Sequence, residues 1–395
     1  MFITTCVQQN CLYFLRHKLL SLSLLFLLGS LGCDPENQGG VLLAETSGPY
    51  PFGSQLMDEL YDNYKQFENG QDYKRVMVVI PIGEGKSIGL LLRPVRLKSY
   101  DFHAESNFEA TKHSIETAVA LYAGDFEPQS PEDFARFNVT QDSYGRKYFS
   151  GLLVYKSQVY EFQPTNQTNL LPEAENIVFL PENNNPKNTI YGRAEGSYEV
   201  EIGLVGDLAL YQKIGASDPI ATADYLLSIF NLVSGIYETQ LDITIRVPFL
   251  EVQTSSFISE TNNAYTLLNS FTDWGKTAYA TSGAAYVFML SGKLFENGIL
   301  GIAWPHSLCK SSGYFGLARI FDQSLFNTTL VVSHELGHSF SLPHDSNCFA
   351  DLFDHEFIMC PSFIQVSPRF SNQSLETGAQ IINESFESGC LPPIY

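Results

Sequence analysis

The sequence predicts two folded domains, a mainly β domain followed by an α/β domain with a largely parallel sheet. Two cores of ordinary size are possible because the chain has 395 residues, of which 44% are hydrophobic. Up to about residue 191, strand-like runs alternate with clusters of turn-forming residues, whereas strand and helix signals alternate from residue 198 onward. We therefore expect the boundary between the two domains near Ser197.

The charge balance argues against one class of partner. The chain has 23 basic and 43 acidic residues, which gives a formal net charge of −20. Such a field repels the phosphate backbone of nucleic acids and the surface of anionic bilayers. We therefore expect no nucleic-acid partner. Charged residues make up only 17% of the chain and aromatic residues 13%, a balance typical of a folded extracytoplasmic protein.

Residues 1–33 have the layout of an export signal. Arg16, His17 and Lys18 precede an apolar run at 19–31, which is shorter than the ~20 residues of a bilayer-spanning helix, and no later stretch is expected to span a membrane. The segment Ser30–Cys33 resembles a loose bacterial lipobox, in which the cysteine is lipidated. We expect an exported protein that touches a membrane only through a lipid anchor at Cys33, on a bacterial cell envelope. Simple secretion is the alternative.

Residues 34–50 are rich in Gly, Pro and Glu and suit a tether between this anchor and a folded body. The first domain, expected at 51–196, contains strand-like runs separated by turn-forming clusters. The runs lie at Arg75–Ile82, Ile88–Leu92, Tyr148–Val154 and Gln158–Phe162. The stretch 181–188 is rich in Asn and Pro, which predicts a linker before the second domain.

The second domain, expected at 197–395, alternates strands and helices, a pattern typical of an α/β domain. The predicted strands are Tyr198–Val205, Leu241–Val252, Tyr286–Leu290, Ile299–Trp304 and Gly316–Ile320. The predicted helices are Asp218–Tyr237, Asn262–Thr281 and Thr328–Phe340. Because the strands are separated by helices, most of them should run parallel in one sheet.

The last of these helices carries the pentapeptide His334–His338, of the form His-Glu-x-x-His. Residues four apart lie about 6 Å from each other on one helix face, so both histidines can reach the same Zn²⁺ ion. Glu335 lies on the adjoining surface, from which its carboxylate can accept a proton from water at the metal without being a ligand. The spacing predicts a zinc site with a general base beside it.

A catalytic zinc site needs a third ligand, for which His344 is the natural candidate. Ten residues of continuous helix would carry His344 ~15 Å along the axis from His334, so the helix must break after His338. Pro343 cannot continue a helix, and it also pushes the residue before it out of the helical region. The sequence therefore contains a break where the ligand geometry demands one.

This pattern resembles the zinc signature of the metzincins. Residues His334 to His344 read His-Glu-x-x-His-x-x-Ser-x-x-His, and the following Asp345 is typical of the reprolysin or ADAM-like branch. The resemblance covers about residues 197–395. The segments that are similar to strands, helix, Met-turn and closing cysteine of that branch are Tyr198–Asp207, Leu268–Trp274, Gly301–Cys309, Ile358–Ser362, Phe370–Asn372 and Cys390–Pro392.

The resemblance implies a mixed, mostly parallel five-stranded sheet, an active-site helix and a small C-terminal subdomain. It also implies that His334, His338 and His344 bind Zn²⁺ as the cofactor. Glu335 would be the general base, and Met359 would form the apolar floor beneath the metal. A substrate peptide would pair with the edge strand that contains Gly301, Ile302 and Ala303.

Four cysteines lie in the last quarter of the chain, an even number that predicts two disulfides in an exported protein. The resemblance suggests which residues pair. One disulfide would join Cys309 to Cys390 and secure the end of the chain. The other would join Cys348 to Cys360 in the loop below the zinc.

The first domain resembles a reprolysin-type propeptide in the segments Tyr148–Tyr155 and Tyr160–Pro164. No cysteine lies between Cys33 and Cys309, so we do not expect the first domain to supply an inhibitory thiolate to the zinc. The alternative is that this domain is a permanent β-rich companion of the second one.

One departure from the family bears on activity. Ser341 stands where the family has a glycine at the helix break, and a non-glycine residue held in the left-handed region costs about 1 kcal/mol or more. The sequence as a whole predicts a monomeric zinc metalloendopeptidase that hydrolyses extracellular proteins or peptides. The alternative is a surface binding protein on the same fold with weak or no catalysis.

Overall fold

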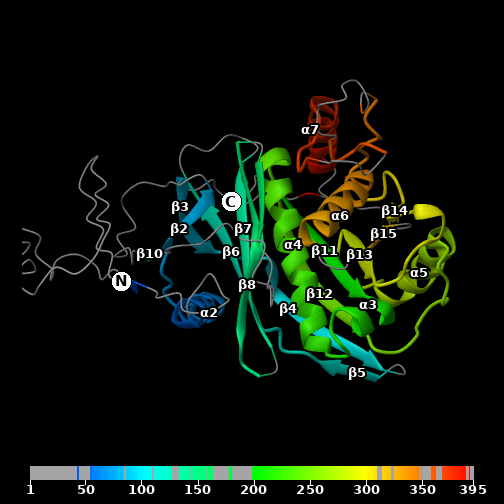
Figure 1. Ribbon diagram of the computed structural model, residues 1–395. Helices are drawn as coiled ribbons and strands as arrows, with labels where there is room; N and C mark the ends of the chain where they lie inside the picture. Colours follow the sequence, from blue (N-terminus) through cyan, green and yellow to red (C-terminus); the bar gives the residue numbers. More distant parts are fainter. Residues whose placement is uncertain are drawn as a thin grey trace, which may run out of the picture.

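The computed structural model describes residues 42–43, 54–83, 86–108, 111–126, 133–142, 144–156, 158–162, 178–179, 198–308, 314–321, 324–346, 348, 357–361, 367–387 and 391. The expected export signal, Cys33, the stretch 181–188, Cys309 and Cys390 lie outside these residues. We call the described residues of 54–162 the N-terminal half and those of 198–391 the C-terminal half. Figure 1 shows two sheets with the long helix α4 (Pro219–Leu241) between them.

The N-terminal half is built on a six-stranded antiparallel sheet in the order β2-β3-β6-β7-β8-β9. Helix α2 (Ser54–Glu68) packs on this sheet, and the Tyr122 hydroxyl donates to Leu60 O over 2.7 Å. The strands are β2 Val76–Gly83, β3 Lys86–Pro94, β6 Val119–Asp125, β7 Phe134–Gln141, β8 Lys147–Tyr155 and β9 Gln158–Phe162. A separate antiparallel pair joins β1 (Leu42–Leu43) to β10 (Val178–Phe179). The strand-like runs seen in the sequence coincide with β2, β3, β8 and β9.

The second sheet has seven strands, in the order β14-β15-β13-β11-β12-β4-β5. The C-terminal half supplies β11 Tyr198–Gly206, β12 Ile243–Gln253, β13 Tyr286–Ser291, β14 Gly301–Ala303 and β15 Phe315–Arg319. The sheet is mixed and mostly parallel, because only the β14–β15 and β4–β5 pairs are antiparallel.

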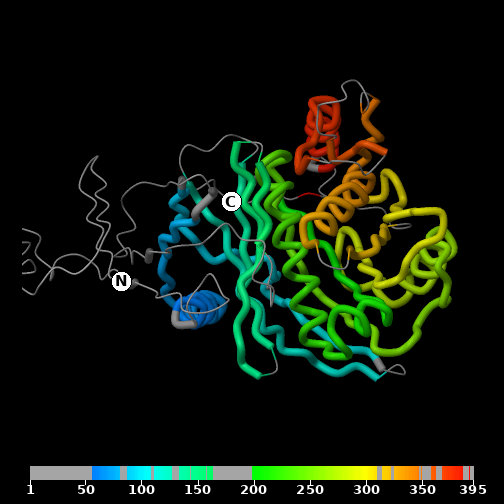
Figure 2. The backbone as a smooth tube through the Cα atoms, in the orientation of Figure 1, coloured from blue at the N-terminus to red at the C-terminus, as the bar shows by residue number. Residues whose placement is uncertain are grey.

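The C-terminal half supplies the five expected strands, but the sheet itself has seven. Strand β4 (Lys98–Phe108) of the N-terminal half pairs in parallel with β12, and β5 (Thr111–Ser114) pairs with β4. Figure 2 shows the cyan backbone of β4 and β5 continuing the sheet beyond the green strands. Strands on both sides of the predicted boundary near Ser197 therefore belong to the same sheet.

Helix α4 has a clear start and end. The Asp218 side chain caps it by accepting from Ile220 N–H over 2.8 Å, Pro219 opens the first turn, and Asp242 follows Leu241 in the left-handed region at φ 58°. Contrary to the sequence expectation, α4 is long and apolar enough to cross a membrane, but it is mostly buried inside the protein. Its polar side chains are buried together with the apolar ones, as in a core element that is covered on every side.

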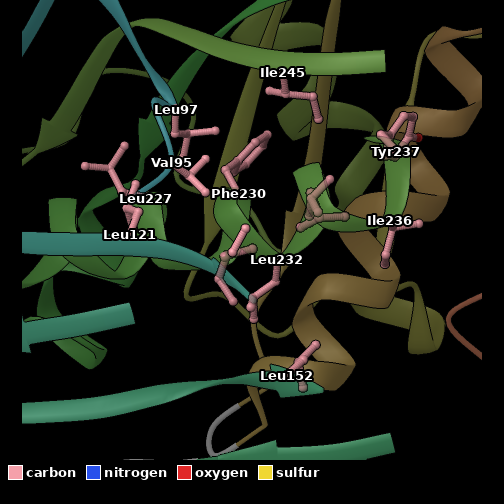
Figure 3. Packing of buried hydrophobic residues seen from close by; sticks show 14 of the residues in the cluster. Val95, Leu97, Leu121, Leu152, Leu227, Phe230, Leu232, Ile236, Tyr237 and Ile245 are labelled. Atoms are coloured by element: carbon pink, nitrogen blue, oxygen red, sulfur yellow. The ribbon is translucent and has the colours of Figure 1, made fainter. Parts of the chain in front are cut away.

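The remaining helices lie on the C-terminal half. They are α3 Leu208–Lys213, α5 Ala264–Ala278, α6 Leu325–Ser339 and α7 Asn372–Glu387. A second hydrophobic cluster, which includes Phe249, Phe271 and Phe315, packs α5 against the seven-stranded sheet. The main cluster spans both halves: Figure 3 shows Leu121 and Leu152 of the six-stranded sheet in one core with residues of α4 and with Ile245 of β12.

Candidate metal centre and active site

Helix α6 holds two of the predicted metal ligands. Its start is capped by Ser324, whose Oγ accepts from Asn327 N–H over 3.0 Å. On its buried side, the Tyr237 hydroxyl of α4 donates to Ser333 O over 2.9 Å. The helix is therefore fixed to the core on one side, while His334 and His338 line a cavity on the other.

The helix ends as the ligand spacing requires, although the break comes before Pro343. Ser341 adopts φ 67°, its N–H donates to His338 O over 3.0 Å, and Leu342 N–H donates to Gly337 O over 3.0 Å. These two hydrogen bonds form the Schellman motif, in which glycine is the usual left-handed residue. The chain then turns back and brings His344 to the other two histidines.

The three histidines meet at their Nε2 atoms. His344 Nε2 lies 3.2 Å from His338 Nε2 and 3.3 Å from His334 Nε2. Nitrogen ligands of a tetrahedral zinc, each ~2.0–2.1 Å from the metal, are separated by roughly 3.3–3.4 Å. The donor set is therefore compatible with a Zn²⁺ ion.

The other ring nitrogens of two histidines are held by backbone carbonyls. His334 Nδ1 donates to Ile358 O over 2.6 Å, and His338 Nδ1 donates to Leu342 O over 2.9 Å. This fixes the tautomer that leaves Nε2 free to bind a metal. Burial lowers the pKa of His334 to about 3 and also lowers the pKa of His338 and of His344. The lowered pKa values favour the neutral rings, the form that binds metal.

Glu335 lies next to the histidines and is almost fully buried, at 7% exposure. Burial raises the pKa of its carboxyl group to about 8. The side chain packs on the backbone of Gly301 in β14, where a Cβ atom would lie 2.5 Å from Glu335 Cγ. The carboxyl group therefore stands between the metal ligands and the edge strand.

A cavity of about 690 Å³ contains these groups. The three histidines and Glu335 form one part of its wall, and Gly301, Ile302 and Ala303 of β14 form another. Strand β14 is the last strand of the sheet among the described residues, and it pairs with β15 on one side. The structure thus brings together the predicted ligands, the predicted base and the predicted peptide-binding strand.

The loop after α6 adds Cys360 and Pro361 to the wall of the cavity. Met359 is fully buried beneath the helix, where a Cβ on Gly337 would lie 2.5 Å from Met359 Sδ. A disulfide joins Cys348 to Cys360, the pairing that the resemblance suggested. The other suggested pair, Cys309 with Cys390, lies outside the described residues.

Asp345 ties this loop to helix α7. Its buried carboxylate accepts hydrogen bonds from the Ser371 hydroxyl and, over 2.9 Å, from the Ser374 hydroxyl, while its N–H donates to Met359 O over 3.0 Å. From the sequence, Asp345 is only a marker of the family branch, and neither Ser371 nor Ser374 is a candidate partner for it. No local pattern relates them, because the partners are separated by more than twenty positions.

A mixed sheet with an edge strand along the cleft, a helix with two converging histidines that ends in a Schellman motif, and a buried methionine below it define a metzincin-type domain. Residues 198–393 match the family model "Reprolysin (M12B) family zinc metalloprotease". This domain belongs to the reprolysin branch of the metzincins.

Three similar proteins come from animals. The mouse "Disintegrin and metalloproteinase domain-containing protein 19" is 31% identical over 40% of this chain and 18% of its own length. The "Disintegrin and metalloproteinase domain-containing protein adm-2" of Caenorhabditis elegans is 26% identical over 41% of this chain and 16% of its own length. "Snake venom metalloproteinase TM-1" of Protobothrops mucrosquamatus is 24% identical over 37% of this chain and 72% of its own length.

The alignments with the two disintegrin and metalloproteinase proteins thus cover less than a fifth of the length of either protein. A solved structure titled "Structure of a chaperone-substrate complex" has a TM-score of 0.36 and 12% identity over 60% of this chain and 38% of that chain. This similarity is too low to support an inference about function.

Proposed function

We propose that this protein is a zinc-dependent endopeptidase that cleaves extracellular proteins or peptides. One observation carries the proposal. The Nε2 atoms of His334 and His338 lie 3.3 Å and 3.2 Å from His344 Nε2, in the same cavity as the buried carboxyl group of Glu335. Three histidines with a nearby general base are the catalytic set of zinc peptidases, whereas structural zinc sites have four protein ligands.

Substrate binding would use the edge strand. A peptide in extended conformation can add to β14, because β14 borders the cavity and ends the sheet among the described residues. Main-chain hydrogen bonds would hold the peptide in register, and its scissile carbonyl would lie over the histidine cluster. We expect each protein chain to bind one peptide, since all the residues of the site belong to a single chain.

The chemistry of the chain's own residues follows from their positions. His334, His338 and His344 would hold the zinc ion, which when bound polarises a carbonyl and makes water a better nucleophile. Glu335 would accept the proton of the attacking water and deliver it to the nitrogen of the leaving amine. Because Gly301 has no side chain, the carboxyl group of Glu335 can lie close to the peptide-binding strand.

The second candidate function is a surface binding protein with weak or no catalysis. Ser341 favours it, since the residue occupies a left-handed conformation, φ 67°, that is unfavourable for a side chain. The three Nε2 atoms nevertheless converge, and both hydrogen bonds of the helix cap form. The strain at Ser341 thus leaves the ligand geometry intact, which supports the enzyme over the binding protein.

We also propose that the protein is exported. The interpretation of 1–33 as an export signal agrees with similarity to a venom metalloproteinase. The bacterial lipobox at Cys33 has no support from the comparisons, since the three named relatives are animal proteins. A lipid anchor at Cys33 therefore stays a prediction.

A direct test uses the purified full-length protein and a mixed peptide library. The zinc enzyme should cut internal peptide bonds, stop when a zinc chelator is added, and resume when zinc is restored. Sequencing the products would give the residues on either side of the cleaved bond. A protein that binds one zinc ion and leaves the library intact would favour the binding protein instead.

A further inference from the structure

The two halves of the protein share a sheet, a core and a network of polar contacts. We propose that the N-terminal half is a permanent part of this protease, which stays bound after any cut in the linker, and that the chain hydrolyses peptides with this half in place. That the two halves stay bound concerns assembly alone. That the chain hydrolyses peptides with the N-terminal half in place rests on the proposed function.

The N-terminal half covers an edge of the catalytic sheet. All residues of β12 from Ile243 to Gln253 are buried, and β4 covers the free edge of this strand in a parallel register that places Phe249 opposite His103 and Gln253 opposite Asn107. Val247 N–H also donates to Leu97 O over 2.7 Å. Loss of β4 would leave a long apolar strand with unpaired backbone groups, which is the form of edge that promotes aggregation.

A buried charge on β12 has its ionic partner in the N-terminal half. Glu251 is 3% exposed, and its carboxylate accepts from Lys112 Nζ over 2.6 Å and from Asn107 Nδ2 over 2.9 Å. Lys112 belongs to β5 and Asn107 to β4. A buried carboxylate is tolerated when it is paired and hydrogen-bonded. Tyr279 and Gln253 of the C-terminal half also donate to Glu251, so this half relies on the other for the ionic partner and for the Asn107 hydrogen bond.

The outer face of α4 carries Asp224, Asn231, Gly235 and Glu238 at helical spacing. Ala118 N–H donates to Asp224 Oδ1 over 2.8 Å, and Asn231 Nδ2 donates to Phe137 O over 3.1 Å. These contacts place polar groups of α4 directly against β6 and β7.

The same face fits the six-stranded sheet in shape and charge. A Cβ on Gly235 would lie 2.7 Å from Arg136 Cγ, so only glycine allows β7 to approach this closely. One turn further, Arg136 and Glu238 form a buried ion pair. Leu121 and Leu152 lie in the same hydrophobic cluster as Leu227, as Figure 3 shows. Both sides of the contact are therefore complementary in polar and apolar groups.

The N-terminal half also reaches the helix that carries the zinc ligands. Glu161 of β9 accepts from Phe326 N–H over 3.1 Å and from the Ser324 hydroxyl over 3.3 Å at the start of α6. A carboxylate at this end of a helix stabilises the helix dipole. Glu161 is therefore a positioning residue for α6, which it contacts at the end away from His338.

The contact surface lies away from the catalytic cavity. The residues that line the cavity come from positions 265 to 361, so no described residue of the N-terminal half takes part in its wall. Figure 1 shows the six-stranded sheet on the side of α4 that faces away from α6 and β14. Removal of this half is therefore not needed to clear the described part of the cleft.

The test begins with a protease recognition sequence inserted into the full chain at 181–188. After the cut, the two fragments should elute together at the size of the intact protein and unfold in one cooperative transition. Separate elution, with a folded C-terminal fragment that retains zinc, would overturn the proposal. These readouts do not depend on hydrolysis, so they remain decisive if the proposed function fails.

A variant of the interface supplies the matched comparison. Glu238→Ala leaves Arg136 without its ionic partner, and we expect the cut fragments of this variant to separate at lower urea concentration than those of the parent. Lys276→Ala removes a charge from an exposed pair on α5 and should leave the association unchanged. Equal urea dependence for Glu238→Ala and Lys276→Ala would contradict the role of the α4 contact.

Peptide hydrolysis with the N-terminal half in place is measured separately. An intact chain that carries an affinity tag after residue 50 should cleave peptides while every active fraction retains the tag. Activity that appears only in fractions lacking the tagged half would overturn this statement. If the tagged chain is inactive before and after the cut, the proposed function fails while co-elution still decides the assembly.

Discussion

Gly301 and Glu335 are in direct contact: a Cβ atom at position 301 would lie 2.5 Å from Glu335 Cγ and 2.8 Å from Oε1. The absence of a side chain in the edge strand thus sets where the carboxyl group of the base can lie. The contact joins β14, which would bind the peptide, to α6, which would bind the metal. It relates two parts of the site that are far apart in the sequence.

The first prediction follows from this contact. In Gly301→Ala the new methyl group must displace the Glu335 side chain. We expect peptide hydrolysis to fall by about 10²-fold, because a displacement of about 1 Å can cost that much. The zinc content should stay unchanged. Gly89→Ala is the matched control, because its Cβ would meet only Met77 Sδ at 3.7 Å.

A double-mutant cycle makes the same contact measurable without activity. Gly301→Ala should lower the free energy of unfolding in the parent but not in a Glu335→Ala background, where the clashing side chain is missing. Urea unfolding of the four proteins provides the data. An equal loss of stability in both backgrounds would show that Gly301 acts independently of Glu335.

The second prediction concerns the strain at Ser341. Glycine adopts φ 67° without steric cost, so Ser341→Gly should raise the free energy of unfolding by about 1 kcal/mol and retain both zinc and activity. Ser339→Gly, in the last turn of α6, should instead lower it by roughly 0.5–1 kcal/mol. Chemical denaturation would measure both, and changes of the same sign would refute this account of the helix break.

The third prediction concerns Asp224, which is 2% exposed at the contact between α4 and β6. Burial raises the pKa of its carboxyl group from 3.8 to about 7. The unfolded state therefore loses its proton at lower pH than the folded state does. The cost to stability is absent below about pH 4, grows as the pH rises, and is complete above about pH 7.

Asp224→Asn removes this cost and keeps an oxygen that can accept from Ala118 N–H. We expect the variant to be more stable than the parent at pH 8, by on the order of 4 kcal/mol at most, and the difference to vanish near pH 4. Urea unfolding at several pH values would measure the difference. A difference that is the same at pH 4 and pH 8 would contradict the shift.

Local patterns in the sequence predict that the three histidines meet, as they do in the structure. The spacing of His334 and His338 on one helix, and the need for a break before His344, are properties of a single short segment. The strands and helices of the C-terminal half are likewise visible because each has a regular pattern of apolar residues. The sequence also shows Ser341 as an unusual residue, and its left-handed conformation is observed.

Contacts between distant segments were not predictable in this way. Strand β4 is mostly polar, and it forms because β12 offers an open edge, which no pattern within Lys98–Phe108 reveals. The contacts of Glu161 with α6 and of Gly301 with Glu335 depend equally on the folded arrangement. Helix α2 is a different case, since its buried Leu56, Leu60 and Tyr64 follow helical spacing and could have been recognised.

The central claim is that the histidines hold metal while Glu335 transfers protons. Glu335→Gln keeps the size and polarity of the side chain but removes the base, whereas His338→Ala removes a ligand. We expect His338→Ala to lose zinc and activity together.

The most direct measurement compares peptide hydrolysis and zinc content in the parent and in Glu335→Gln. The account predicts one zinc per molecule and the same fold in both proteins, with hydrolysis lower in Glu335→Gln by at least the 10²–10⁴-fold typical of a lost general base. If the parent cleaves peptides and the zinc-loaded Glu335→Gln protein cleaves them equally fast, the proposed mechanism is wrong.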